Sequence, residues 1–220
     1  MSRILILAAL PEEADAFRPG EGKVSSHGHL PVRKIADSIA IATCGLGKVN
    51  AALAVGLLAT PETQFVAMTG TCGRLTAVEG DCFWIARAIQ HDYGARKASG
   101  HVHYRAGDWP MGEPRDIIFT AMSDPGLGLP HATIASGDLF LECPNTAADL
   151  ASRLGAELVD MEVAAMAQAA ETLRLRWAAI KAVTDDADGG SAGDFNANLR
   201  KAARRAGEAI ERLVENLPPH

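Results

Sequence analysis

The chain has 220 residues, of which 48% are hydrophobic and 22% are charged, a composition typical of a folded globular protein. Its 21 lysines and arginines against 27 aspartates and glutamates give a net charge of −6, which disfavours general nucleic-acid binding and attachment to anionic membranes. No stretch reaches the roughly 18 consecutive apolar residues of a membrane span, and the length predicts a single domain over residues 1–220.

Short apolar runs alternate with helix-like stretches along the chain. In chain order, the expected strands cover residues 3–9, 39–44, 65–69, 82–89, 131–135, 157–159 and 178–183. The expected helices cover residues 49–58, 117–121, 146–154, 161–175 and 195–217. This alternation predicts an α/β fold, a three-layer αβα sandwich built on a mainly parallel sheet. Between the fourth strand and the second helix, the polar residues 91–113 predict a long loop or excursion within the domain.

The cysteines and paired histidines indicate neither disulfides nor a metal site. Four widely separated cysteines, at positions 44, 72, 82 and 143, form no CxxC motif. They favour reduced thiols in the core of a cytoplasmic protein. The pairs at 27/29 and 101/103 have HxH spacing, but no carboxylate or cysteine accompanies them at ligand spacing. We therefore expect surface histidines and no metal.

Four regions place small or acidic residues directly after an apolar run. They are LAALPEEAD (7–15), MTGTCG (68–73), SGDLF (136–140), and VDMEVAA with KAVTDDAD (159–165 and 181–188). Open α/β sheets bind their ligands at such strand ends. Each segment alone is a weak signal, because acids after strands often cap helices or face solvent, and a phenylalanine is often simply buried.

Taken together and in this order, these segments resemble the 5′-methylthioadenosine/S-adenosylhomocysteine nucleosidases of the purine nucleoside phosphorylase superfamily. The resemblance runs from residue 3 to about residue 213, with its weakest part between 95 and 130. Besides Glu12-Glu13, it rests on GLGKVNAA (45–52), TGTCG (69–73), GD (80–81), SGDLF, DMEVAA (160–165) and TDDAD (184–188). It implies a twisted mixed central sheet flanked by helices, and usually a homodimer.

The activity implied by this resemblance is hydrolysis of the N-glycosidic bond of 5′-methylthioadenosine, S-adenosylhomocysteine or a related 5′-modified adenosine, with release of adenine and no cofactor. Such a bond breaks through an oxocarbenium-like transition state. The leaving base has to be protonated, the cationic sugar stabilised, and a water held on the opposite face.

Two residues match the family's catalytic carboxylates. Asp185 matches the general acid that protonates N7 of adenine, a role that requires a carboxyl group able to hold a proton near neutral pH. The nearby Asp186 and Asp188 are candidates for assisting it. Glu13 matches the carboxylate that activates the water, and the adjacent Glu12 is the alternative.

Five further residues match positions that bind the substrate. Thr71 lies where the family has a hydroxyl residue touching the water. Phe140 matches the aromatic residue that stacks on adenine, and Leu141 the residue whose backbone reads the edge of the base. Met161 matches the methionine beneath the sugar. Glu162 matches the glutamate that binds the ribose hydroxyls and places negative charge near the developing cation.

The nucleophile is predicted to be water rather than phosphate. A dianionic phosphate needs arginines and backbone donors. Phosphorylase relatives typically carry an arginine where this chain has Met68, and no arginine lies between residues 4 and 16. Glu12 and Glu13 would repel phosphate. A phosphorylase or a hydrolase of another purine nucleoside, including a bulky 5′-substituted one, remains the alternative function.

The chain departs from the family pattern in two places. Lys181 stands where close relatives have arginine, and Asp160 falls on a position that is glutamate in some members. The region 95–114 matches poorly, so Tyr104, Trp109 and Met111 are candidates either for the pocket of the 5′ substituent or for an interface. The sequence therefore leaves the 5′ group open between methylthio, homocysteinyl, methyl and something bulkier.

Overall fold

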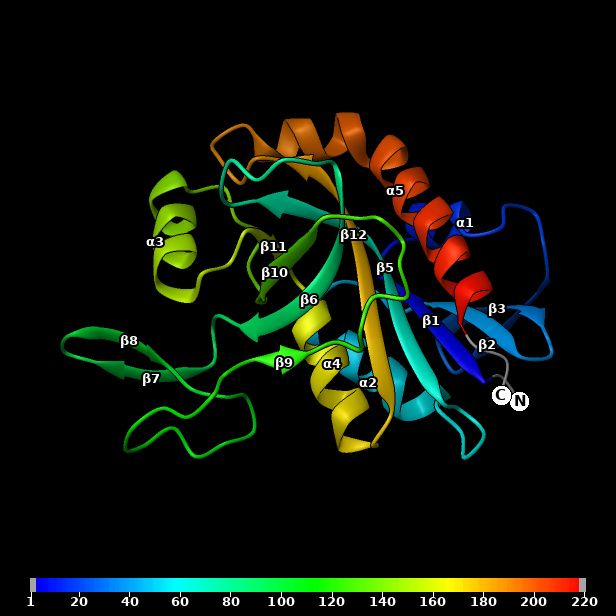
Figure 1. Cartoon of the computed structure of the whole chain (residues 1–220), viewed down its shortest axis with the longest axis horizontal. Coiled ribbons are helices and arrows are strands. Elements are labelled where there is room, and N and C mark those ends of the chain that lie inside the picture. The colour runs from blue at the N-terminus through cyan, green and yellow to red at the C-terminus, as the bar shows by residue number, and fades with distance from the viewer. Residues whose placement is uncertain (1–2, 218–220) are drawn as a thin grey trace.

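The computed structural model describes residues 3–217 and is built around one large mixed sheet (Figure 1). Its ten strands follow the order β11–β10–β6–β12–β5–β1–β4–β3–β2, with β9 on the edge of β6. They are β1 (Ile4–Ala8), β2 (Lys23–His27), β3 (Leu30–Ala36), β4 (Ile39–Thr43), β5 (Phe65–Arg74), β6 (Cys82–Gln90), β9 (Phe119–Thr120), β10 (His131–Ser136), β11 (Leu158–Asp160) and β12 (Arg176–Asp185). The expected α/β fold with a mixed central sheet is confirmed.

Part of this sheet closes on itself, which a simple layered sandwich does not predict. Strand β1 runs parallel to β4 and β5, and β12 runs parallel to β5 but antiparallel to β6. Strand β11 pairs with β10 on one side and with the end of β5 on the other, at Arg74 and Gly73. The closure is possible because β5 continues to residue 74, five residues beyond its expected end.

Helices cover both faces of the sheet. They are α1 (Pro11–Ala16), α2 (Lys48–Leu58), α3 (Pro144–Leu154), α4 (Val163–Thr172) and α5 (Ser191–Asn216). One core lies between the sheet and α1 with α5, and the other between the sheet and α2 with α4, while α3 packs on the strand ends near β11 (Figure 1). Gly207 lets α5 approach α1, because a Cβ there would lie 2.4 Å from the carbonyl oxygen of Ala16.

One local expectation is wrong, and several short elements were not predicted. The segment 117–121, expected as a helix, contains strand β9 paired with β6, consistent with its β-branched and aromatic residues. The short helix α1 and the hairpin β2–β3 were not predicted. The excursion expected over 91–113 is present and carries a separate two-stranded hairpin, β7 (Gly94–Lys97) and β8 (Gly100–His103), which projects from the body of the molecule (Figure 1).

The four cysteines are free thiols, but only Cys44 and Cys72 are buried, and Cys143 is exposed at the start of α3. The expectation that all four belong to the core is therefore wrong. His27 and His29 are exposed as expected, whereas His101 and His103 are half-buried with their rings 4.5 Å apart.

Over residues 3–217, the helices lack the combination of length and apolar character needed to cross a membrane.

Candidate active site

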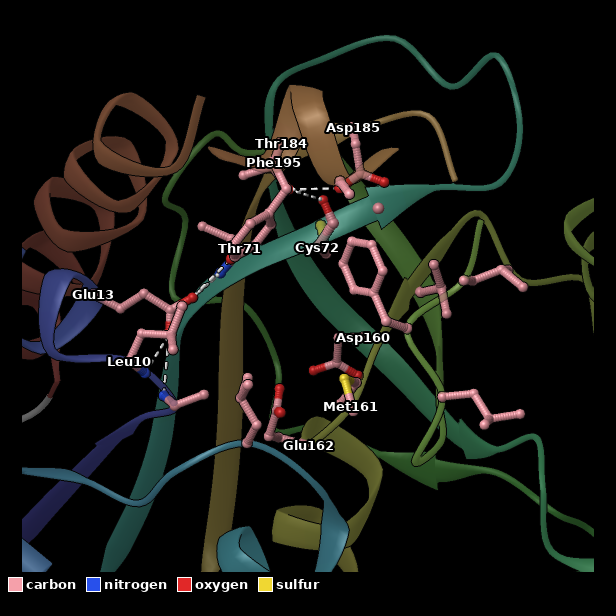
Figure 2. A pocket seen from close by; sticks show the side chains of 18 of the residues that line it. Leu10, Glu13, Thr71, Cys72, Asp160, Met161, Glu162, Thr184, Asp185 and Phe195 are labelled. Atoms are coloured by element: carbon pink, nitrogen blue, oxygen red, sulfur yellow. Dashed lines mark hydrogen bonds between the residues drawn. The ribbon is translucent and has the colours of Figure 1, made fainter. Parts of the chain in front are cut away.

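A cavity of about 370 Å³ opens at the carboxyl ends of β1, β11 and β12 and beside the last residues of β5. This volume is within the range of about 300–1,000 Å³ typical of small-molecule sites. Figure 2 shows Glu13 on one side, Asp185 on another, and Asp160, Met161 and Glu162 along the floor. All seven predicted site residues line it, namely Glu13, Thr71, Phe140, Leu141, Met161, Glu162 and Asp185.

Glu13 is fixed by four hydrogen bonds in the first turn of α1. Its Oε2 accepts from the backbone N–H groups of Ala9 and Leu10 at 3.0 and 3.1 Å. Its Oε1 accepts from the N–H and the hydroxyl of Thr71 at 2.8 and 2.7 Å (Figure 2). Gly70 makes this approach possible, since a Cβ there would lie 2.8 Å from Oε1. The neighbouring Glu12 is exposed and does not line the cavity.

Asp185 closes the opposite side of the cavity at the end of β12. Its Oδ2 accepts from the Thr184 hydroxyl at 2.8 Å, and its Oδ1 accepts from the N–H of Ala187 at 3.0 Å. Asp185 follows a register shift between residues 183 and 185 of β12, and it lines the cavity. Asp186 and Asp188, the candidates for assisting it, are exposed and lie outside the cavity lining.

The floor of the cavity holds a buried cluster of charges. Glu162 occupies the N-cap position of α4, and its Oε1 accepts from the N–H of Gly47 at 2.9 Å. Behind it, the ammonium of Lys181 lies 3.0 Å from Asp160 Oδ2 and 3.6 Å from Glu162 Oε2. Burial raises the pKa of Glu162 to about 7, with Lys181 opposing the shift and Asp160 adding to it.

Apolar side chains form the mouth of the cavity. Phe140 is 47% exposed, so it is not a core residue, and it meets Phe195 edge to face with ring centres 5.9 Å apart. Phe195 comes from α5 and was missed, as was Leu46 from the turn before α2. Phe195 does not directly follow an expected strand, and Leu46 is neither acidic nor small, so the pattern of acidic or small residues after strands did not point to them. Trp109 and Met111 are exposed and stand apart from this lining, so they do not form a 5′ pocket within one chain.

The titratable carboxyl groups and ammonium or guanidinium groups are unevenly distributed around the cavity, because its lining is acidic. Within the described residues, the cavity is lined by four carboxylates, those of Glu13, Asp160, Glu162 and Asp185, and by no lysine, arginine or histidine. Met68, which occupies the position of the phosphorylase arginine, is fully buried within the sheet. A phosphate ion would therefore meet negative charge without a cationic partner in this cavity.

Comparison with known proteins identifies the family. A sequence model described as the phosphorylase superfamily matches residues 3–215. A 5′-methylthioadenosine/S-adenosylhomocysteine nucleosidase of Mycobacterium bovis is 28% identical over 208 residues, covering 81% of this chain and 82% of that protein. A futalosine hydrolase of Thermus thermophilus is 29% identical over 180 residues, covering 77% and 78%.

Solved structures share the fold at lower identity. The native futalosine hydrolase of Helicobacter pylori superposes with a TM-score of 0.83, at 22% identity and 98% coverage of both chains. The 5′-methylthioadenosine/S-adenosylhomocysteine nucleosidase of the same organism, with butyl-thio-DADMe-Immucillin-A, gives a TM-score of 0.84 at 22% identity, with 99% of each chain covered. The chain therefore belongs to the phosphorylase superfamily, and its resemblance to the 5′-methylthioadenosine/S-adenosylhomocysteine nucleosidases within it is confirmed.

Proposed function

We propose that this N-glycosyl hydrolase releases adenine from a 5′-modified adenosine whose 5′ substituent is uncharged, with 5′-methylthioadenosine as the preferred substrate. The observation that carries the proposal is the convergence of Glu13, Glu162 and Asp185, three acids far apart in sequence, on one cavity that also presents Phe140. An N-glycosidic bond needs an acid for the leaving group, negative charge for the cationic sugar, and a base for the incoming water.

In this mechanism Asp185 gives its proton to N7 of adenine while the electron pair of the glycosidic bond moves onto the base. The carboxylate of Glu162 stabilises the positive charge that develops on the ribose and binds its hydroxyls. Water then adds to C1′, and Glu13 accepts the proton that this water loses. The products are adenine and the free 5-modified ribose.

The remaining lining residues hold the substrate in register. Phe140 stacks on the base, and Phe195 braces that ring from the side. The backbone of Leu141 reads the edge of the base, Met161 packs beneath the sugar, and the Thr71 hydroxyl helps to place the water next to Glu13. Positioning of this kind contributes a large part of an enzymatic rate enhancement.

The acidic lining of the cavity supports water as the nucleophile and an uncharged group as the 5′ substituent. Phosphate and a 5′ group ending in a carboxylate are anions, and neither would find a lysine or arginine in the lining supplied by the described residues. Leu10, Leu46 and Leu139 instead supply apolar contacts suited to a thioether or alkyl group. The similarity to futalosine hydrolases makes futalosine the second candidate substrate.

A substrate panel with and without phosphate tests this proposal. The panel contains 5′-methylthioadenosine, S-adenosylhomocysteine, 5′-deoxyadenosine and futalosine, and the measurement is release of free base and of the sugar product. We expect phosphate-independent turnover, with kcat/KM for 5′-methylthioadenosine at least about tenfold above that for futalosine, because a buried unpaired charge is costly. Phosphate-dependent formation of ribose 1-phosphate would instead identify a phosphorylase, and binding without any turnover would identify a nucleoside-binding module.

We also propose that the protein works as a homodimer, as its family resemblance implies. Val49, Leu53 and Leu57 are exposed and spaced by four residues, which places them along one side of α2, and the exposed Leu46 lies in the turn before this helix. A contiguous apolar surface of this kind is typical of a protein interface. Light scattering should give a mass of two chains for the native protein and one chain for Leu53→Glu. A native protein that runs as one chain at micromolar concentration would contradict the proposal.

A further inference from the structure

Lys181 is a buried cation directly behind the catalytic cavity. Its side chain is 1% exposed within β12, and an ammonium group so deeply buried has to be paired with anions. The Nζ atom lies 3.0 Å from Asp160 Oδ2 and 3.6 Å from Glu162 Oε2. Burial by itself would lower the pKa of Lys181, but Asp160 and Glu162 outweigh that effect and raise it, so the group is charged.

Asp160 anchors this ammonium to the surrounding backbone. Its Oδ1 accepts from the Ser136 hydroxyl at 2.5 Å, and its Oδ2 accepts from the N–H of Val163 at 3.0 Å. The same Ser136 oxygen accepts from the N–H of Ala164 at 2.9 Å. The ion pair is thus tied to β10 and to the first turn of α4, which begins directly after Glu162.

The contact between Lys181 and Glu162 differs from the one with Asp160. At 3.6 Å it is longer than a hydrogen bond, so the attraction is electrostatic. The other oxygen of Glu162 is held by the N–H of Gly47 at 2.9 Å. Glu162 is therefore oriented from one side and charge-balanced from the other, while Oε2 keeps hydrogen-bonding capacity for a sugar hydroxyl.

We propose that Lys181 is a positioning residue that keeps Glu162 ionised beneath the sugar, and that Asp160 holds the ammonium at the distance this requires. The inference rests on the proposed function, because it concerns the carboxylate assigned to the ribose. The pairing of lysine with the shorter aspartate is consistent with this arrangement: a compact ammonium can lie between two carboxylates without occupying both oxygens of either one.

The charges facing Glu162 fix the direction of the expected effects. They come from Lys181 on β12, Asp160 on β11 and Glu13 on α1, and the Cys44 thiol also lies nearby. Glu162 already has a pKa raised to about 7 by burial, so it loses its charge as the pH falls through neutrality. Removing Lys181 should raise that pKa further, and removing the charge of Asp160 should lower it.

The pH dependence of kcat/KM tests the inference with two single variants. For Lys181→Met, the acidic limb is expected to move to higher pH by about one unit or more. At a pH below both limbs, kcat/KM of the variant should then be about tenfold lower than that of the native enzyme. For Asp160→Asn, the limb is expected to move to lower pH. A merely structural role predicts a loss of the same factor at every pH in both variants, and that outcome would overturn the inference.

A double variant provides a test if Lys181→Met does not fold, and a direct titration follows the ionisation of Glu162 without an activity assay. Asp160→Asn with Lys181→Met removes one charge of each sign, so it provides a test if Lys181→Met alone does not fold. Lys181 has a larger effect on the pKa of Glu162 than Asp160 has. The acidic limb of the double variant should therefore still move to higher pH. Carbon-13 NMR titration of the Glu162 carboxyl, assigned with Glu162→Gln, follows ionisation without turnover. An identical titration in the native protein and in the lysine variant would refute the role of Lys181, whereas inactivity of the native enzyme on the whole substrate panel would refute the proposed function alone.

Discussion

Replacing Asp185 by asparagine is expected to reduce kcat for adenine release by about 10²–10⁴-fold, the usual contribution of a positioned general acid. Asparagine has nearly the same size and can still accept from the N–H of Ala187, so the end of β12 should keep its conformation. It cannot deliver a proton to the departing base. The measurement is kcat with 5′-methylthioadenosine, alongside the melting temperature of the variant.

The adjacent Asp186 provides a matched control for this substitution. It is exposed, and its carboxylate pairs with Arg74 at 3.4 Å, an exposed contact of the kind that contributes about 0–1 kcal/mol. Asp186→Asn should therefore leave kcat within about twofold of the native value. A substrate whose leaving group needs no proton, such as a nitrophenyl riboside, should lose much less activity in Asp185→Asn. Retention of adenine release by Asp185→Asn would remove this residue as the acid.

The strands of the sheet were predictable because they are buried on both faces. Such strands appear in the sequence as continuous apolar runs, as in β1, β4 and the first half of β5. The hairpin β2–β3 was not predicted, because β2 is exposed along its whole length and has no apolar pattern. The sheet closure through β11 depends on the length of β5, and the polar-looking residues 70–74 gave no indication that the strand continues.

The acids of the site were predictable from their positions after strands, but their arrangement was not. The choice between Glu12 and Glu13 follows only from the first turn of α1, which turns Glu13 inward and leaves Glu12 exposed. Phe195 reaches the cavity from a helix far along the chain. The pairing of Lys181 with Asp160 and Glu162 joins β12 to the start of α4. A sequence pattern does not show how close the Lys181 ammonium lies to these two carboxylates.

Glu13→Gln is the second substitution with a large expected effect, and it should lower kcat by at least about 10²-fold through loss of the base for water. The native carboxylate accepts from the N–H groups of Ala9 and Leu10 and from both donors of Thr71. In either orientation, the amide NH₂ of glutamine would face at least one of these backbone donors. An unsatisfied buried N–H costs about 1–3 kcal/mol, so a lower melting temperature should accompany the loss of kcat.

Two matched variants separate the loss of kcat that comes from the missing base from the loss that comes from lower stability. Glu12→Gln makes the same chemical change on the exposed neighbour and should leave both kcat and the melting temperature near their native values. Thr71→Val removes one donor to Glu13 but keeps the carboxylate, so its effect on kcat should be much smaller than that of Glu13→Gln. If Glu13→Gln, assayed where it is fully folded, turned over as fast as the native enzyme, the proton of the water would have to go elsewhere. A loss confined to Glu12→Gln would assign that proton to the exposed neighbour and contradict the orientation of α1 on which the water-activating role of Glu13 depends.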